Sequence, residues 1–133
     1  MKNKKKIALG STAFAACLLA GSLVASASSY SSSLDISSNS TRDGATRSYT
    51  AGTHNIKMTP TKYKEGNSSY VTTSVRSGGS WSNTTHASGG MNLTGYYSNN
   101  KNLGYVKGGS YFYHFSTQGQ NGFIANPVVM SSR

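Results

Sequence analysis

The stretch YVTTSVR, at residues 70–76, decides the fold. Val71, Thr73 and Val75 lie on one face of an extended chain, because successive side chains of a strand point to opposite faces. Tyr70 and Arg76 lie on the other face, with the remaining polar residues. This alternation predicts a β-strand with one face in a core and the other in solvent.

Two further stretches of the chain also have the pattern of strands. Residues 111–115 (YFYHF) are apolar or aromatic on both faces, which predicts a central strand covered on both sides. Ile56 and Met58 alternate with polar residues before Pro60, which either ends that strand or places it at a sheet edge.

Turn residues separate these strands at intervals of roughly ten residues. Glycine doublets at residues 78–79, 89–90 and 108–109 and the run SNNKN at 98–102 are typical of hairpin turns. The further expected strands lie at residues 81–87, 91–97, 103–107 and 123–130, the last interrupted by Pro127. With no helical periodicity in this region, the pattern predicts an all-β fold, a small antiparallel β-sandwich of about six to eight short strands.

The first 27 residues have the features of a secretory signal peptide. Four lysines within residues 1–6 precede a mostly apolar run, and Ala25-Ser26-Ala27 matches an A-x-A cleavage site. Glycine and serine interrupt the run, which favours cleavage over a transmembrane anchor. The run continues past Cys17, which argues against lipidation of that residue. We expect cleavage after Ala27, secretion, and a Gram-positive bacterium as the source.

Cleavage would leave 106 residues, enough for one domain with a modest core. The only cysteine would be removed with the leader, so the fold would be stable without disulfides. Nine lysines and arginines would remain against three acidic residues, a net charge of +6. Such a protein is attracted to wall polymers and acidic lipid head groups, although the charge could also serve solubility alone.

The start of the expected secreted chain differs in composition from the rest. Residues 28–48 are rich in serine and threonine, and only Leu34 and Ile36 alternate as apolar residues. We therefore predict a flexible N-terminal segment over 28–48, which could contain one short strand, and a sandwich domain over 49–133.

Residues that could carry catalysis are scarce. The three acidic residues lie outside the clearest strands, which argues against a carboxylate pair. No G-x-S-x-G motif marks a serine nucleophile. His54, His86 and His114 are not spaced to share a strand face, which argues against a three-histidine metal site. We expect no enzymatic activity, no cofactor and no metal.

Tyrosine and basic side chains remain as the means of recognition. All nine tyrosines follow residue 27, and a rigid ring with a hydroxyl group suits binding sites. Tyr70 and Tyr96 are expected to be exposed, whereas Tyr97 and Tyr113 are expected in the core. The candidate ligand-binding residues are Tyr70, Arg76, Tyr96, Lys101 and Lys107.

Three stretches in the C-terminal half resemble motifs of a known family. YVTTSV at residues 70–75, THASG at 85–89 and YFYHF at 111–115 resemble the lactococcin 972 family of secreted bacteriocins. The resemblance implies an exported, cysteine-free β-sandwich that binds the cell-wall precursor lipid II and blocks septum formation without forming pores. The chain departs from this family in its 18 residues after Phe115 and in the long extension before Tyr49. The resemblance identifies no particular binding residue in this sequence.

Together these features predict a secreted, cationic, bacteriocin-like antimicrobial protein. Its expected partner is a cell-wall precursor or another anionic envelope polymer rather than nucleic acid, and we expect no transmembrane segment after the leader. A non-toxic wall-associated binding or structural module is the first alternative. An enzyme of unrecognised type is the second.

Overall fold

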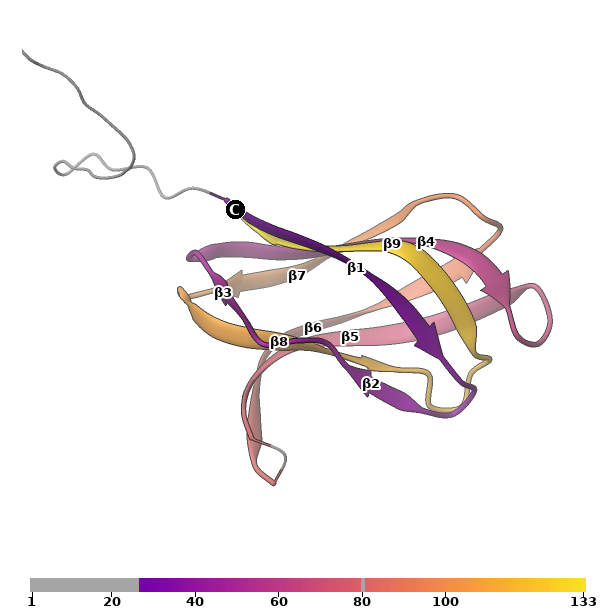
Figure 1. Cartoon of the computed structure of the whole chain (residues 1–133), viewed down its shortest axis with the longest axis horizontal. Coiled ribbons are helices and arrows are strands. Elements are labelled where there is room, and N and C mark those ends of the chain that lie inside the picture. The colour runs from indigo at the N-terminus through magenta and orange to yellow at the C-terminus, as the bar shows by residue number, and fades with distance from the viewer. Residues whose placement is uncertain (1–26, 80) are drawn as a thin grey trace, which may run out of the picture.

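The computed structural model describes residues 27–79 and 81–133. These residues form two antiparallel β-sheets packed face to face, and they contain no helix (Figure 1). The predicted all-β sandwich is confirmed, with nine strands instead of six to eight. In the described part of the chain, no helix is long and apolar enough to cross a membrane. The predicted leader lies outside the described residues, apart from Ala27.

Two sheets of four and five strands share the nine elements. The strands are β1 (Ser28–Ile36), β2 (Thr41–Asp43), β3 (Arg47–Tyr49), β4 (Gly52–Tyr63), β5 (Ser68–Gly78), β6 (Asn83–Thr94), β7 (Asn99–Val106), β8 (Gly109–Ser116) and β9 (Phe123–Ser132). The first sheet has the order β1-β9-β4-β7. The second has the order β2-β8-β5-β6, and β3 continues the edge formed by β2 along β8.

The core lies between the sheets. Val71, Thr73 and Val75 of β5 are buried there, which confirms the alternation predicted for this strand. On β8, Tyr113 is fully buried in the core, and Phe112 is buried on the opposite face. The prediction of a central strand covered on both sides is therefore confirmed. The largest fully buried side chains are Tyr113, Phe123, Ile36, Ile56, Met58 and Leu93.

The segment predicted to be flexible is instead part of the sandwich. Residues 28–48 contain β1, β2 and most of β3, and the sandwich begins at Ser28 rather than at residue 49. An edge strand pairs on one side only and needs few apolar side chains. In β1, Leu34 and Ile36 face the core while the neighbouring serines face solvent. The low hydrophobicity of this segment therefore reflects its edge position.

Two further predictions on strand limits are wrong, and one is confirmed. The doublet at residues 89–90 is not a turn, because β6 runs through it and pairs with β5 over its whole length. Tyr97 is 61% exposed, because β6 ends at Thr94 and the positive φ of Gly95 (70°) breaks the alternation. At Pro60, β4 has already left its partner β7, so this proline lies at a sheet edge as predicted.

Candidate functional site

The outer face of the second sheet carries a polar hollow of about 470 Å³. It lies over β2, β8 and β5, on the side of the sheet that faces away from the core. Its lining residues are Thr41, Tyr70, Thr72, Ser74, Arg76, His114, Ser116, Gln118 and Gln120. No acidic residue lines this hollow, so it favours neutral or anionic ligands.

Strand register explains why this face is hollowed. Thr41 of β2 lies opposite Ser116 of β8, which in turn lies opposite Thr72 of β5. These three side chains are small, and each carries a hydroxyl group that can donate and accept hydrogen bonds. Longer side chains, Tyr70 and Arg76 among them, line the same hollow. The result is a hydroxyl-rich floor with larger side chains beside it.

Arg76 supplies the positive charge of the hollow. Its Nε donates to Ser74 Oγ at 2.9 Å, and its Nη1 donates to Asn83 Oδ1 at 3.3 Å. Both partners are neutral, and Arg76 forms no ion pair with any residue that the structure describes. A guanidinium group has five N–H donors, so several remain available to an anionic group of a ligand.

Tyr70 lies across a glycine of the neighbouring strand. A Cβ atom at Gly90 would lie 1.7 Å from the Tyr70 hydroxyl oxygen, so the ring occupies the space that a side chain would need. Tyr70 is 38% exposed. The ring is therefore supported by β6 while part of it stays open to solvent, as a stacking surface requires.

His114 is oriented by a carboxylate. Asp43 lies opposite His114 in the β2–β8 register, and its Oδ1 is 2.5 Å from His114 Nδ1. When Nδ1–H donates to Asp43, Nε2 is the nitrogen left for another partner. Ser74 lies opposite His114 on the other side, so Ser, His and Asp form one row across three strands.

This row does not have the geometry of a catalytic triad. A triad needs a hydrogen bond between the nucleophile and the base. The hydroxyl of Ser74 accepts from Arg76, and no hydrogen bond joins it to His114 in the described structure. Ser74 is also buried, which hides its hydroxyl from a substrate. The arrangement suits hydrogen bonding to a ligand better than nucleophilic attack.

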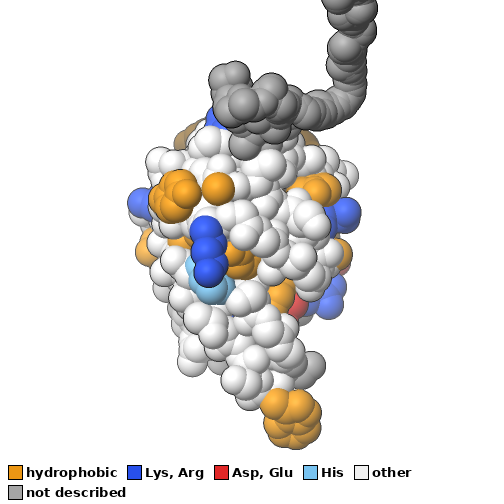
Figure 2. All heavy atoms as spheres, turned by 90° about the vertical axis from the view of Figure 1, so that its left-hand side faces the viewer, with side chains coloured by type: hydrophobic (Ala, Val, Ile, Leu, Met, Phe, Trp, Pro, Cys, Tyr) orange, Lys and Arg blue, Asp and Glu red, His pale blue; other side chains and the backbone are white. Residues whose placement is uncertain are grey.

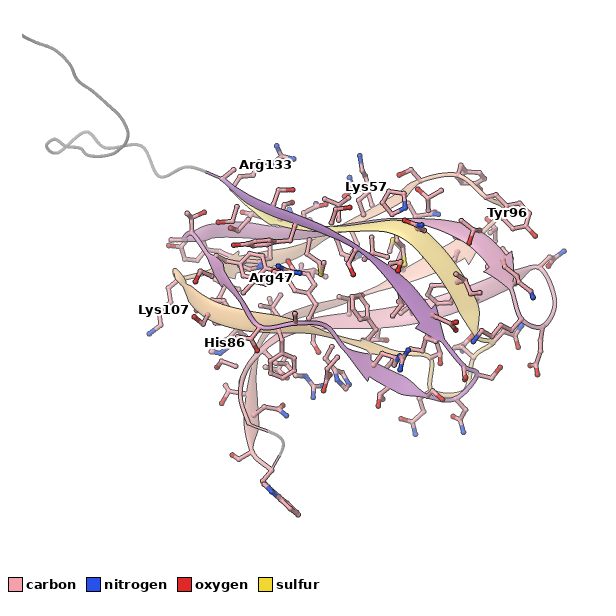
Figure 3. The ribbon with its side chains drawn as sticks, in the orientation of Figure 1. Arg47, Lys57, His86, Tyr96, Lys107 and Arg133 are labelled. Atoms are coloured by element: carbon pink, nitrogen blue, oxygen red, sulfur yellow. The ribbon has the colours of Figure 1, made fainter. Side chains whose placement is uncertain are left out.

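The structure brings together two of the five residues predicted to bind ligand. Tyr70 and Arg76 both line the hollow. Figure 3 places Tyr96 and Lys107 at opposite ends of the molecule, and Tyr96 packs against Tyr63 with ring centroids 5.6 Å apart. Lys101 belongs to β7 and lies close to Gly89 of β6, outside the hollow. The predicted set of five therefore does not form one site.

Other residues that line the hollow were not among those predicted from the sequence to bind a ligand. The alternation at residues 111–115 places His114 opposite in direction to Tyr113, which was a usable sign of outward orientation. The pairing of β8 with both β5 and β2 could not be read from local pattern. Gln118 and Gln120 come from the loop between β8 and β9 and gave no sequence signal.

A second concavity lies at the open edge between the sheets, beside β1 and β2. It has a volume of about 450 Å³ and reaches the core side chains Leu34, Phe115, Val128 and Met130. Its charged lining residues balance, since it contains two arginines and two aspartates: Arg42, Arg47, Asp35 and Asp43. This cleft has less net charge than the hollow to attract an anionic ligand.

His54 lies in a buried aromatic cluster with Tyr49 and Tyr113. His54 is fully buried, and its Nδ1 is 2.8 Å from the hydroxyl oxygen of Tyr113. Burial lowers the pKa of His54, raises the pKa of Tyr49 to about 12, and raises the pKa of Tyr113 further. These groups are buried and stay neutral near pH 7. They stabilise the core and do not form a binding site.

The described residues contain no group of three or more His, Cys, Asp or Glu side chains that could hold a metal ion. His54 is buried in the core, His86 is exposed on β6, and His114 lies on the outer face of β8.

Fold and hollow together define an all-β sandwich with a polar, positively charged concavity on one outer face. No family model, no curated protein and no solved structure matches the chain. The comparisons therefore assign neither a family nor an activity.

Proposed function

We propose that this is a secreted, cationic, bacteriocin-like protein that binds a bacterial cell-envelope component, lipid II or another anionic wall precursor, without catalysing a reaction. The observation that carries the proposal is the guanidinium of Arg76 in a hydroxyl-lined hollow, where it binds only neutral partners and forms no ion pair with a described residue. The resemblance of residues 70–115 to the lactococcin 972 family supports the same ligand class.

The chemistry of the hollow fits a phosphorylated sugar. Arg76 would donate hydrogen bonds to phosphate oxygens, and charged hydrogen bonds of this kind are the stronger ones. Tyr70 offers a ring for a sugar face, while the serine, threonine and glutamine side chains supply donors and acceptors for sugar hydroxyls.

Binding of the purified protein to lipid II and to intact peptidoglycan, at low and moderate salt, tests the proposal. We expect saturable lipid II binding that persists at moderate salt. Arg76→Gln should weaken it by about tenfold, because it removes a charged hydrogen-bond donor. Lys107→Gln is the matched control, since it removes the same charge outside the hollow.

Equal effects of the two variants would refute the role of the hollow. Weak, salt-sensitive adhesion to every anionic polymer would favour the alternative, a non-toxic wall-associated module. Growth assays on Gram-positive indicator strains, with septal morphology scored, separate a bacteriocin from such a module.

A further inference from the structure

The hairpin between β5 and β6 projects from the body of the sandwich (Figure 1). The strands stay paired out to Gly78 and Asn83, and the backbone N–H of Gly79 donates to the Ser82 carbonyl at 3.1 Å. Trp81 lies at the end of this hairpin and is 100% exposed. The largest apolar side chain of the protein is thus held away from the core.

Trp81 is the most exposed of the large aromatic side chains, and its surroundings differ from those of Tyr96 and Tyr97. Tyr96 packs on Tyr63, and the hydroxyl group of Tyr97 is 3.1 Å from that of Thr94. Among the described residues, no aromatic ring pairs with Trp81 and no hydrogen bond holds its indole. Keeping such a ring in water is unfavourable, because a tryptophan buries 150–250 Å² when it is covered.

The surroundings of Trp81 are polar but uncharged. Residues 77–84 contain no lysine, arginine, aspartate or glutamate. Figure 2 shows one hydrophobic group at the projecting end with polar side chains around it. Arg76 lies at the base of the hairpin, where it donates to Asn83. The end of the hairpin can therefore leave bulk water without removing an ionic group from it.

We propose that this hairpin docks on an anionic lipid bilayer, with Trp81 in the interfacial region. Indole rings favour this region, because it accommodates an apolar ring with a polar N–H. The net charge of +6 over residues 27–133 favours an anionic surface. A convex end with one projecting ring cannot enclose a small ligand, and the hollows described above do not include Trp81.

This proposal goes beyond the proposed function and does not depend on what the hollow binds. The test uses vesicles that contain no wall precursor, so failure to bind lipid II would leave its outcome unchanged. Because Trp81 is the only tryptophan in the chain, its fluorescence reports the hairpin alone.

We would add the secreted form of the protein to vesicles of phosphatidylglycerol with phosphatidylcholine, and to vesicles of phosphatidylcholine alone. The expected result is a blue shift of tryptophan emission, with quenching by brominated lipids, on the anionic vesicles. In a sedimentation assay, Trp81→Ser should weaken vesicle binding by about tenfold or more. Tyr105→Ser, which removes an aromatic ring that is 69% exposed on β7, should change it little.

Several results would overturn the proposal. These are an unchanged emission spectrum on anionic vesicles, or equal binding by the two variants. A blue shift that needs no vesicles and grows with protein concentration would assign Trp81 to a second copy of the chain. A shift produced only by peptidoglycan fragments would assign it to a glycan. Thermal unfolding would confirm that the Trp81→Ser protein is folded, since the replaced ring packs against no other described aromatic ring.

Discussion

Gly90 has no side chain, and Tyr70 uses the space that one would fill. The strand backbone at this position is ordinary, since its φ is not positive, so alanine is allowed there. However, the methyl group of an alanine at residue 90 would overlap with the present position of the Tyr70 ring. Tyr70 can therefore take its position in the proposed site because Gly90, on the neighbouring strand, has no side chain.

We predict that Gly90→Ala displaces Tyr70 while the fold is retained. The free energy of unfolding should change by less than about 1 kcal/mol, because the backbone tolerates the methyl group. Lipid II binding should fall to the level of Tyr70→Ala. NMR signals of the Tyr70 ring and a binding titration measure the two effects. Gly79→Ala, where a Cβ atom meets nothing within 4 Å, is the control and should change neither.

His54 makes stability depend on pH. Burial lowers its pKa below the ordinary value of about 6.5, so the unfolded chain takes up a proton at a higher pH than the folded one. The folded state therefore loses stability as pH falls below about 6.5, with a limiting slope of about 1.4 kcal/mol per pH unit. Its Nε2 has no partner among the described residues, so nothing compensates the buried charge.

We predict that His54→Phe removes most of this slope, although it lowers stability at neutral pH by leaving the Tyr113 hydroxyl without its closest partner. Urea unfolding at about pH 7.5 and about pH 5.5 measures the slope. The exposed His86 is the control, and His86→Gln should keep the slope of the parent. A full slope in His54→Phe would assign the acid sensitivity to another group.

At the scale of elements, Thr117 joins two loops. Its hydroxyl donates to the Ser37 carbonyl at 2.6 Å and accepts from the Ser40 N–H at 3.1 Å. The backbone N–H of Asn39, whose φ is 54°, donates to the Thr117 carbonyl at 3.2 Å. The turn between β1 and β2 is thereby tied to the loop that follows β8.

We predict that Thr117→Val destabilises the protein by about 2 kcal/mol, because both polar partners lose their hydrogen bonds in a buried place. Thr73→Val should have the opposite effect and raise the free energy of unfolding by about 1 kcal/mol. The buried hydroxyl of Thr73 has no partner among the described residues, so its removal leaves no hydrogen bond broken. Urea unfolding compares the two variants. Destabilisation of equal size in both would refute the distinction drawn from hydrogen bonding.

Elements with strong alternation could be predicted from the sequence, and those shaped by their neighbours could not. Val71, Thr73 and Val75 define β5 by themselves. Residues 89–90 gave the pattern of a turn, but their glycines make room for Tyr70 and Lys101, which come from other strands. Similarly, Tyr70 and Arg76 could be placed in one site because they share a strand face. Residues joined to that site by register or by a loop, such as His114 and Gln118, could not.

At the scale of the whole molecule, the core stabilises the fold without cross-links. The only cysteine, Cys17, precedes the sandwich, and all nine strands follow it. We predict that the secreted protein begins at Ser28, the first residue of β1, and that a reducing agent leaves its thermal midpoint unchanged. N-terminal sequencing and paired melting curves measure this. A midpoint that falls with reductant would reveal a retained leader and a disulfide between two chains.

The pairing of β1 with β9 brings Ser28 beside Ser132. If the chain crosses a membrane through a channel with its N-terminus first, β1 emerges long before β9 and finds its partner only after β9 has followed. Until then β1 would have no hydrogen-bonding neighbour, because β9 is the only one of the described strands that pairs with it. In an exported chain, this topology would delay completion of the sheet until β9 has crossed the membrane, so a chain passing through a narrow channel would have little folded structure to undo.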